Sequence, residues 1–163
     1  MQEKTRSVDG DLQARVQDLQ ARYAQCIDDA LLDRWPEFFT EDGRYLLTTA
    51  DNFARGLPLG MMYATSQRML RDRIAALREV NVYEAQRYRH VISMPVVARD
   101  GEGVQAQTNF FVARIMHTGE TMLFATGCYR DRITFAADGT LRFAEKVVVL
   151  DSRQIDTLVA IPL

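Results

Sequence analysis

The stretch at residues 72–93, DRIAALREVNVYEAQRYRHVIS, holds the change of periodicity that decides the fold. Ile74 and Leu77 belong to a helical pattern of apolar residues that ends near Asn81. The segment RYRH then leads into VISMPVV at 91–97, a run typical of a β-strand. We therefore expect helices before this stretch and strands after it.

The N-terminal part of the chain predicts one long amphipathic helix. From Asp11 onward, apolar side chains recur at steps of three and four residues, as expected for a single buried stripe. The stripe consists of Leu12, Val16, Leu19, Tyr23, Ile27 and Leu31. This helix should form one layer of the core.

Two shorter helices and one strand are expected before residue 80. Trp35, Phe38 and Phe39 share a short helix, with Pro36 near its first turn, where a missing N–H is harmless. A turn at 42–43 leads into a strand at 44–50. Thr65 or Ser66 is a suitable N-cap for a helix that reaches about Arg78.

The second half of the sequence predicts an antiparallel meander. Strand-like runs cover about 88–98, 104–116, 121–135 and 141–151. The segments DGEG at 100–103, HTGE at 117–120 and DG at 138–139 are typical of hairpin turns. Helices followed by such a meander indicate an α+β fold. A strongly bent antiparallel sheet around the N-terminal helices would form a cone-shaped roll of the nuclear-transport-factor-2 (SnoaL-like) type.

Bulk properties limit the class of protein. We expect a flexible segment at 1–10 and a single domain at 11–163, because the chain is too short for two ordinary domains. The net charge of −2 argues against nucleic-acid binding. No apolar run reaches the roughly 20 residues of a membrane span, and the N-terminus lacks a signal peptide's apolar core. Cys26 and Cys128 form no CxxC motif and predict free thiols in the cytoplasm.

Metal centres are disfavoured by the number of possible ligands. A Rieske cluster needs two cysteines and two histidines in paired spacings, and neither cysteine here has a histidine within two positions. A mononuclear iron triad would require His90 and His117 to converge with a carboxylate, although His117 falls in a predicted hairpin tip. No metal site and no cofactor are therefore expected in this chain.

General acid–base chemistry is the remaining enzymatic interpretation. Tyr23, Tyr45, His90 and either Asp28 or Asp29 could converge where the first helix meets the bent sheet, with His90 as a proton shuttle. The alternative, which we favour, makes His90 a structural residue that is hydrogen-bonded between two arginines and a carboxylate. The candidate pocket or interface residues are Tyr23, Asp29, Tyr45, Arg87, Arg89 and His90.

Two further features suggest contacts with other surfaces. The segment LVAIPL at 158–163 is apolar to its last residue and should dock, either on its own domain or on a neighbouring chain. Four arginines of the third helix make up a face that is either solvated or pairs with carboxylates of another subunit. They are Arg68, Arg71, Arg73 and Arg78.

Several short segments, in order, resemble the small (beta) subunits of aromatic-ring-hydroxylating Rieske non-haem-iron oxygenases. The resemblance covers residues from about 15 to the end and is strongest to the terephthalate dioxygenase and salicylate hydroxylase type. It depends on WP at 35–36, FFT at 38–40, DN at 51–52, DRI at 72–74, ALRE at 76–79, YRH at 88–90, RIMHTGET at 114–121, DS at 151–152 and IPL at 161–163.

This resemblance implies more than the residue patterns do. Such subunits adopt the cone-shaped roll, usually carry no catalytic residue, and assemble with a catalytic alpha subunit, typically as α3β3 with a homotrimer of beta subunits. The alpha subunit carries the Rieske [2Fe–2S] cluster and the mononuclear iron, and electrons come from NAD(P)H. The implied substrate is an aromatic compound, and the likeness to terephthalate and salicylate systems suggests an aromatic acid. The alternative is a free-standing dehydratase, isomerase or ligand-binding protein of the same fold.

Overall fold

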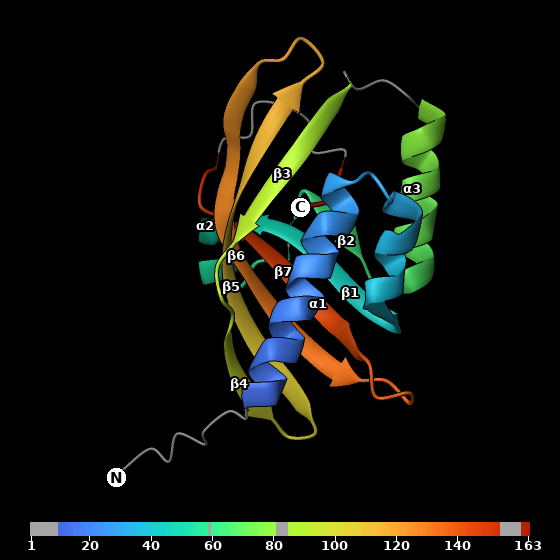
Figure 1. Ribbon diagram of the computed structural model, residues 1–163, viewed down its shortest axis with the longest axis vertical. Coiled ribbons are helices and arrows are strands. Elements are labelled where there is room, and N and C mark those ends of the chain that lie inside the picture. The colour runs from blue at the N-terminus through green and yellow to red at the C-terminus, as the bar shows by residue number, and fades with distance from the viewer. Residues whose placement is uncertain (1–9, 59, 81–84, 154–160) are drawn as a thin grey trace.

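The computed structural model describes residues 10–58, 60–80, 85–153 and 161–163. Within these ranges the helical segments are α1 (Gly10–Asp28), the 3-10 helix η1 (Leu32–Phe38), α2 (Ala50–Ala54) and α3 (Gln67–Val80). The strands are β1 (Phe39–Thr49), β2 (Met62–Ala64), β3 (Gln86–Ile92), β4 (Val96–Asp100), β5 (Gly103–Met116), β6 (Thr121–Phe135) and β7 (Leu141–Leu150). A strongly bent sheet curves around α1, and α3 lies to one side of it (Figure 1).

The sheet is mixed, which corrects the expectation of a purely antiparallel one. Its strand order is β2-β1-β7-β6-β5-β3, with β4 also paired to β5. The pair β1–β7 runs parallel, and the other pairs are antiparallel. A parallel pair needs a long crossover, and the chain between β1 and β7 supplies it. The predicted meander is correct from β5 to β7, where consecutive strands are neighbours.

The hairpin turns lie where the sequence placed them. Gly101, Gly119 and Gly139 have φ values of 60°, 91° and 80°, the left-handed region that glycine adopts without steric cost. The cap of α3 is also confirmed, because the backbone N–H of Met69 donates to the Ser66 hydroxyl at 3.2 Å. Local turn and cap chemistry was sufficient for these predictions.

Two element boundaries differ from the prediction. Phe39 opens β1 instead of closing the short helix, and the pairing of β1 with β7 shifts register between Phe39 and Arg44. Gly43 lies in this irregular part of β1, where a Cβ would come within 2.8 Å of the Phe39 Cβ. The run 88–98 is two strands, because Pro95, just before β4, has no N–H for a ladder hydrogen bond.

The core lies between α1 and the concave face of the sheet. The predicted stripe of α1 is buried from Leu12 to Ile27, whereas Leu31 lies beyond the helix and is 48% exposed. Trp35 and Phe39 are fully buried and meet edge to face at 5.7 Å. The aromatic side chains at helical and strand spacing are therefore mainly core, as expected.

Gly127 of β6 is the most crowded glycine of the sheet. A Cβ there would come within 2.1 Å of the main-chain oxygen of Val149 on β7 and 3.1 Å of the Phe110 ring. We expect Gly127→Ala to lower the free energy of unfolding by about 2–3 kcal/mol, because the neighbouring backbone cannot retreat without losing its pairing. Urea denaturation measures this loss. Gly10→Ala, with nothing within 4 Å, is the control, and equal stability of both variants would contradict the packing.

Candidate functional site

Tyr23 of α1 and Tyr45 of β1 meet at the last residue of the sequence. The Tyr23 and Tyr45 hydroxyls donate to the main-chain oxygen of Leu163 at 2.9 and 3.1 Å. The Leu163 N–H in turn donates to the Tyr45 hydroxyl at 3.2 Å. Leu163 is completely buried, and the Trp35 ring packs edge to face on Tyr45 at 5.1 Å. We call Tyr23, Trp35 and Tyr45 the Leu163 seat.

The described end of the chain thus docks inside its own domain. Ile161 and Leu163 are both buried and belong to the main hydrophobic core. Docking was predicted, and the structure selects the chain's own domain over a neighbour's surface. The remainder of the segment predicted to dock, 158–160, lies outside the described residues.

His90 and Arg89 gather at the end of α1 around one carboxylate, that of Asp28. The His90 backbone N–H donates to Asp28 Oδ2 at 2.9 Å, and Nδ1 lies 2.6 Å from Oδ1. The Arg89 guanidinium approaches Oδ2 at 3.9 Å. Since a carboxylate only accepts, it keeps the proton of the ring on Nδ1. This Asp28 cluster (Asp28, Arg89 and His90) fits the favoured structural interpretation of His90.

The other candidates lie beside this cluster. Asp29 is exposed and follows the last residue of α1, so Asp28 is the aspartate that binds His90. Arg87 is exposed on β3, and with Asp29 it lines a hollow of about 430 Å³ between the end of α1 and the start of β3. Among the described residues, no hydrogen bond joins the Leu163 seat to the Asp28 cluster. The residues predicted to form one pocket or interface are therefore divided between the Leu163 seat and the surroundings of the Asp28 cluster.

The Asp28 cluster makes a stability prediction that separates the two side chains that contact the Asp28 carboxylate. His90→Ala should cost about 2 kcal/mol of unfolding free energy, because it removes a buried, charge-assisted hydrogen bond. Arg89→Ala should cost less than about 1 kcal/mol, because the guanidinium is 58% exposed and its contact with Asp28 is long. Chemical denaturation of both variants measures the difference. A larger loss for Arg89 than for His90 would reverse this ranking.

A buried polar network that the sequence analysis did not identify lies deeper in the roll. Lys146 Nζ lies 3.0 Å from Gln20 Oε1 and 3.1 Å from Asp131 Oδ2. Gln20 Nε2 donates to Asp131 Oδ2 and to the Thr108 hydroxyl. All four side chains are buried. We call Gln20, Thr108, Asp131 and Lys146 the Lys146 network.

The environment of Lys146 changes its proton affinity. The ammonium lies over the rings of Tyr23, Tyr129 and Phe143, at 4.5, 3.9 and 4.2 Å from their centroids. Burial lowers the pKa of Lys146 to about 8, although Asp131 opposes the shift. Burial likewise raises the pKa of Asp131, against the effect of Lys146. Asp131 and Lys146 are cross-strand partners. The sequence feature that could have revealed this pair was an acidic and a basic residue at inward-facing positions of two predicted strands.

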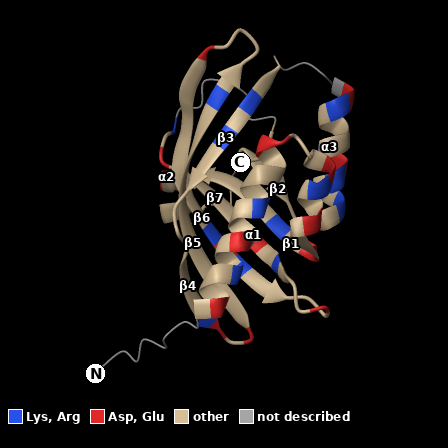
Figure 2. Ribbon diagram, in the orientation of Figure 1, with Lys and Arg blue, Asp and Glu red and all other residues tan. Residues whose placement is uncertain are grey.

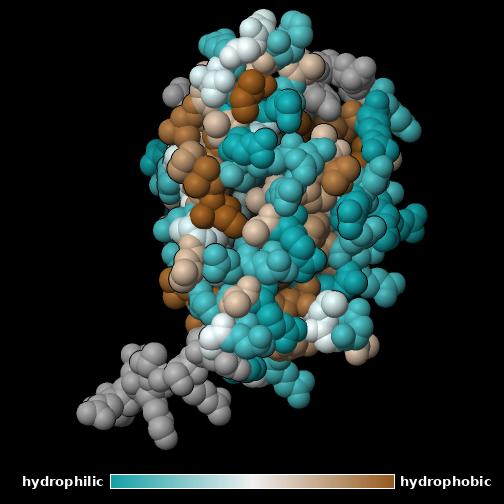
Figure 3. All heavy atoms as spheres, in the orientation of Figure 1, coloured by the Kyte–Doolittle hydropathy of each residue, from teal (hydrophilic) through white to brown (hydrophobic). Residues whose placement is uncertain are grey.

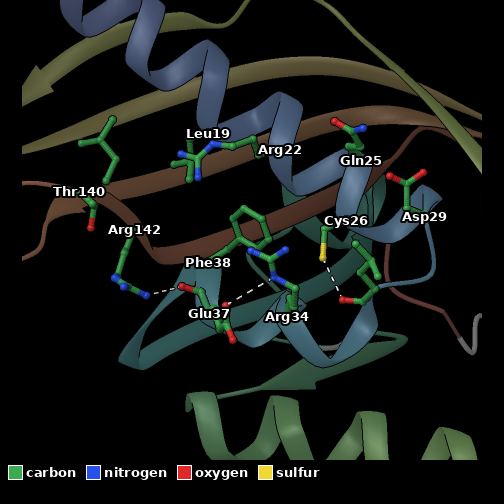
Figure 4. A pocket seen from close by; sticks show the side chains of 12 residues that line it. Leu19, Arg22, Gln25, Cys26, Asp29, Arg34, Glu37, Phe38, Thr140 and Arg142 are labelled. Carbon is green, nitrogen blue, oxygen red and sulfur yellow. Dashed lines mark hydrogen bonds and ion pairs between the residues drawn. The ribbon is translucent and has the colours of Figure 1, made fainter.

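A second hollow, of about 420 Å³, lies between α1, η1 and the start of β7 (Figure 4). Within it, Arg34 pairs with Glu37, and Arg142 donates to the Glu37 main-chain oxygen. Cys26 lies on its wall with the thiol hydrogen-bonded to the Leu31 main-chain oxygen at 3.1 Å. Burial raises the pKa of Cys26 to about 11, so the thiol is protonated at neutral pH and a poor nucleophile.

Other candidate features of the sequence have ordinary surroundings. Both cysteines are free, as predicted. His117 is exposed at the β5–β6 hairpin, and the described residues contain no group of three His, Cys, Asp or Glu side chains placed to hold a metal. Arg78 of the arginine-rich face pairs with Asp33, within the chain. Figure 2 shows the basic residues along α3. Within the described part of the chain, no helix has the length and apolarity needed to cross a membrane.

Comparison with known proteins identifies the family. The SnoaL-like domain family matches residues 11–147. The beta 1 subunit of the terminal oxygenase component of terephthalate 1,2-dioxygenase from Comamonas sp is 49% identical over 144 residues, which are 88% of this chain and 93% of the relative. The chain belongs to the SnoaL-like beta subunits of aromatic-ring dioxygenases.

Two further relatives agree with this assignment of the beta subunit. The small subunit of anthranilate 1,2-dioxygenase from Burkholderia cepacia is 42% identical over 147 residues, covering 89% of this chain and 90% of the relative. A crystal structure assigned as the beta subunit of an aromatic-ring-hydroxylating dioxygenase from Novosphingobium aromaticivorans matches with a TM-score of 0.84 and 33% identity, over 93% of this chain and 97% of that one. The predicted family and the SnoaL-like roll are both confirmed.

Proposed function

We propose that this beta subunit is a non-catalytic, structural component of a ring-hydroxylating dioxygenase that oxidises an aromatic carboxylic acid with O2 and electrons from NAD(P)H. The observation that carries the proposal is its identity of 49% and 42% to subunits of dioxygenases named for terephthalate and anthranilate. Both names denote aromatic acids. The free thiols are consistent with a cytoplasmic complex.

The redox centres of such an enzyme do not fit the residues of this chain. The sequence contains two histidines and two cysteines. His90 is committed to Asp28, and His117 lies at an exposed hairpin. Burial raises the pKa of both thiols, which disfavours the thiolate form that binds iron. We therefore assign the Rieske cluster and the mononuclear iron to a catalytic alpha subunit, in an α3β3 complex.

The rival function, a free-standing dehydratase, isomerase or ligand-binding protein, would need an open cone with convergent polar groups. The two tyrosine hydroxyls that could bind a substrate are instead hydrogen-bonded to Leu163. The two hollows described above both lie against the C-terminal half of α1, and neither is lined by Tyr23 or Tyr45. These observations favour the structural subunit.

The outer face of the sheet carries an exposed apolar surface suited to a neighbouring subunit. Val91 of β3 and Phe111 of β5 are cross-strand partners, yet they remain 49% and 44% exposed. Leu123 of β6 pairs with Ala113, the next outward-facing residue of β5 after Phe111, and is 64% exposed. Val96 of β4, which pairs with Gln107 of β5 and is 73% exposed, extends this outer apolar patch. Figure 3 shows apolar side chains along the sheet side of the molecule, in contrast to the hydrophilic surface over α1 and α3.

We expect the outer apolar patch to mediate contact between beta subunits. Desolvation of such a patch drives association, and a buried carboxylate would oppose it. Phe111→Glu combined with Leu123→Glu should therefore convert a trimer into a monomer at micromolar concentration. Light scattering coupled to size-exclusion chromatography measures the mass of the purified chain.

The control is Tyr63→Glu, which changes an exposed aromatic side chain of β2, the strand at the opposite edge of the sheet. This variant should keep the mass of the parent chain. Co-expression with a matched alpha subunit tests the wider proposal, since the parent should co-purify with it in equal amounts. A monomer that also fails to bind any alpha subunit would refute the structural role, and so would stoichiometric iron with turnover in the isolated chain.

A further inference from the structure

The Leu163 seat has the geometry of a site for a small acylated amino acid. Two phenol hydroxyls converge on one oxygen, and one of them also accepts the N–H of the same residue. Tyr45 therefore contacts both polar groups of a single residue, as a receptor for a peptide group would. Leaving these buried polar groups without hydrogen-bond partners would be costly, because burial has removed the water molecules that would otherwise bond to them.

The surroundings of these hydroxyls are apolar and rigid. Trp35, Phe39 and Tyr45 are fully buried, and their rings contact one another edge to face at 5.1 to 6.2 Å. Leu163 is itself completely buried in this cluster. Aromatic walls with a few convergent polar groups are the usual composition of small-ligand sites.

We propose that the Leu163 seat is a binding site for an N-acyl residue with a branched apolar side chain, and that residues 161–163 occupy it as an intramolecular ligand. The chain end is held at high effective concentration, so it excludes external ligands from the site. Removing residues 161–163 exposes the site to ligands of the same chemistry. The roll is thus closed by a replaceable segment.

The test uses the chain ended after residue 160 and the peptide acetyl-Ile-Pro-Leu as the added ligand. The shortened chain should melt about 5–15 °C lower than the full chain, because the buried side chains of Ile161 and Leu163 are lost. Millimolar acetyl-Ile-Pro-Leu should restore at least half of this loss. Trp35, the only tryptophan, should report binding by a saturable change in fluorescence. Acetyl-Ile-Pro-Gly, which lacks the branched side chain, should have at least tenfold weaker effect.

A matched pair of tyrosine variants identifies the site. In the shortened chain, Tyr45→Phe should abolish restoration by the peptide, whereas Tyr63→Phe, at an exposed tyrosine, should leave it unchanged. Restoration that is equal in both variants would overturn the proposal. An unchanged melting temperature after removal of residues 161–163 would overturn it as well.

A measurement on the full chain keeps the proposal testable if the shortened chain does not fold. The Leu163 N–H is buried and donates to Tyr45, so its hydrogen exchange should be slowed at least about 100-fold relative to an unstructured amide. Tyr45→Phe should release it, and Tyr63→Phe should not. Free exchange of this amide in the parent chain would show that the seat is empty in solution.

Discussion

Lys146→Met is expected to lower the free energy of unfolding by about 3–5 kcal/mol, among the largest effects of a single substitution in this protein. The substitution removes the cation that faces Asp131 in a completely buried pair. It leaves a carboxylate without charge compensation, and Gln20 Oε1 loses its donor. Urea denaturation followed by circular dichroism measures the loss.

The same two strands supply a matched control. Arg132 and Glu145 are cross-strand partners next to Asp131 and Lys146, but the Arg132 side chain is 58% exposed and the ion pair is 3.7 Å long. Arg132→Met should therefore cost less than about 1 kcal/mol. Combining Lys146→Met with Asp131→Leu should recover most of the lost stability, because an apolar pair of similar volume replaces the charges. A loss below 1 kcal/mol for Lys146→Met would show that the pair is not desolvated.

The Lys146 pair also predicts a pH dependence. Burial lowers the pKa of Lys146 from 10.5 to about 8, so between these values the unfolded chain binds one proton more than the folded chain. The unfolding free energy should then rise with pH by up to about 1.4 kcal/mol per unit over this window. The stabilising contribution is present above 10.5 and is lost as the pH falls through about 8. Lys146→Met should lack this contribution.

Above pH 10, stability should fall steeply, by about 4 kcal/mol per pH unit when three tyrosines contribute together. Burial raises the pKa of Tyr23, Tyr45 and Tyr129 above the ordinary value of 10.0. Above this value the unfolded chain loses the phenol protons while the folded chain retains them. The contribution of these tyrosines to the free energy of unfolding is therefore fully present below pH 10 and is lost as the pH rises above this value. Urea denaturation between pH 9 and 11 measures the slope.

Tyr129→Phe offers the clearest test of this slope. Its hydroxyl is buried without a hydrogen-bond partner in the part of the chain that the structure describes, and its ring stacks on Phe110 at 4.3 Å. The substitution should keep the stacking, leave stability at pH 7 nearly unchanged, and reduce the alkaline slope by about one third. Tyr63→Phe, at an exposed position, should keep the full slope. An unchanged slope in Tyr129→Phe would mean that its hydroxyl reaches water in the folded state.

Much of the second half of the fold followed from local patterns. The β5 and β6 runs were predicted to within a residue, because alternating side chains and glycine turns are short-range signals. The Asp28 cluster was only partly predictable. The sequence indicated that His90 needed a carboxylate, but the end of α1 decided between Asp28 and Asp29. The family followed from ordered short segments, which the 49% identity confirms.

Sequence alone thus determined most of the elements, the hairpins, the scarcity of metal ligands and the family, but not α2, β2 or the division of the 88–98 run into two strands. Tertiary structure alone decided the parallel β1–β7 pair, the burial of Lys146 against Asp131 and the docking of Leu163 on Tyr23 and Tyr45. The physical reason is separation along the chain. Periodicity and turn chemistry act over a few residues, whereas these contacts join residues that only the closed roll brings together.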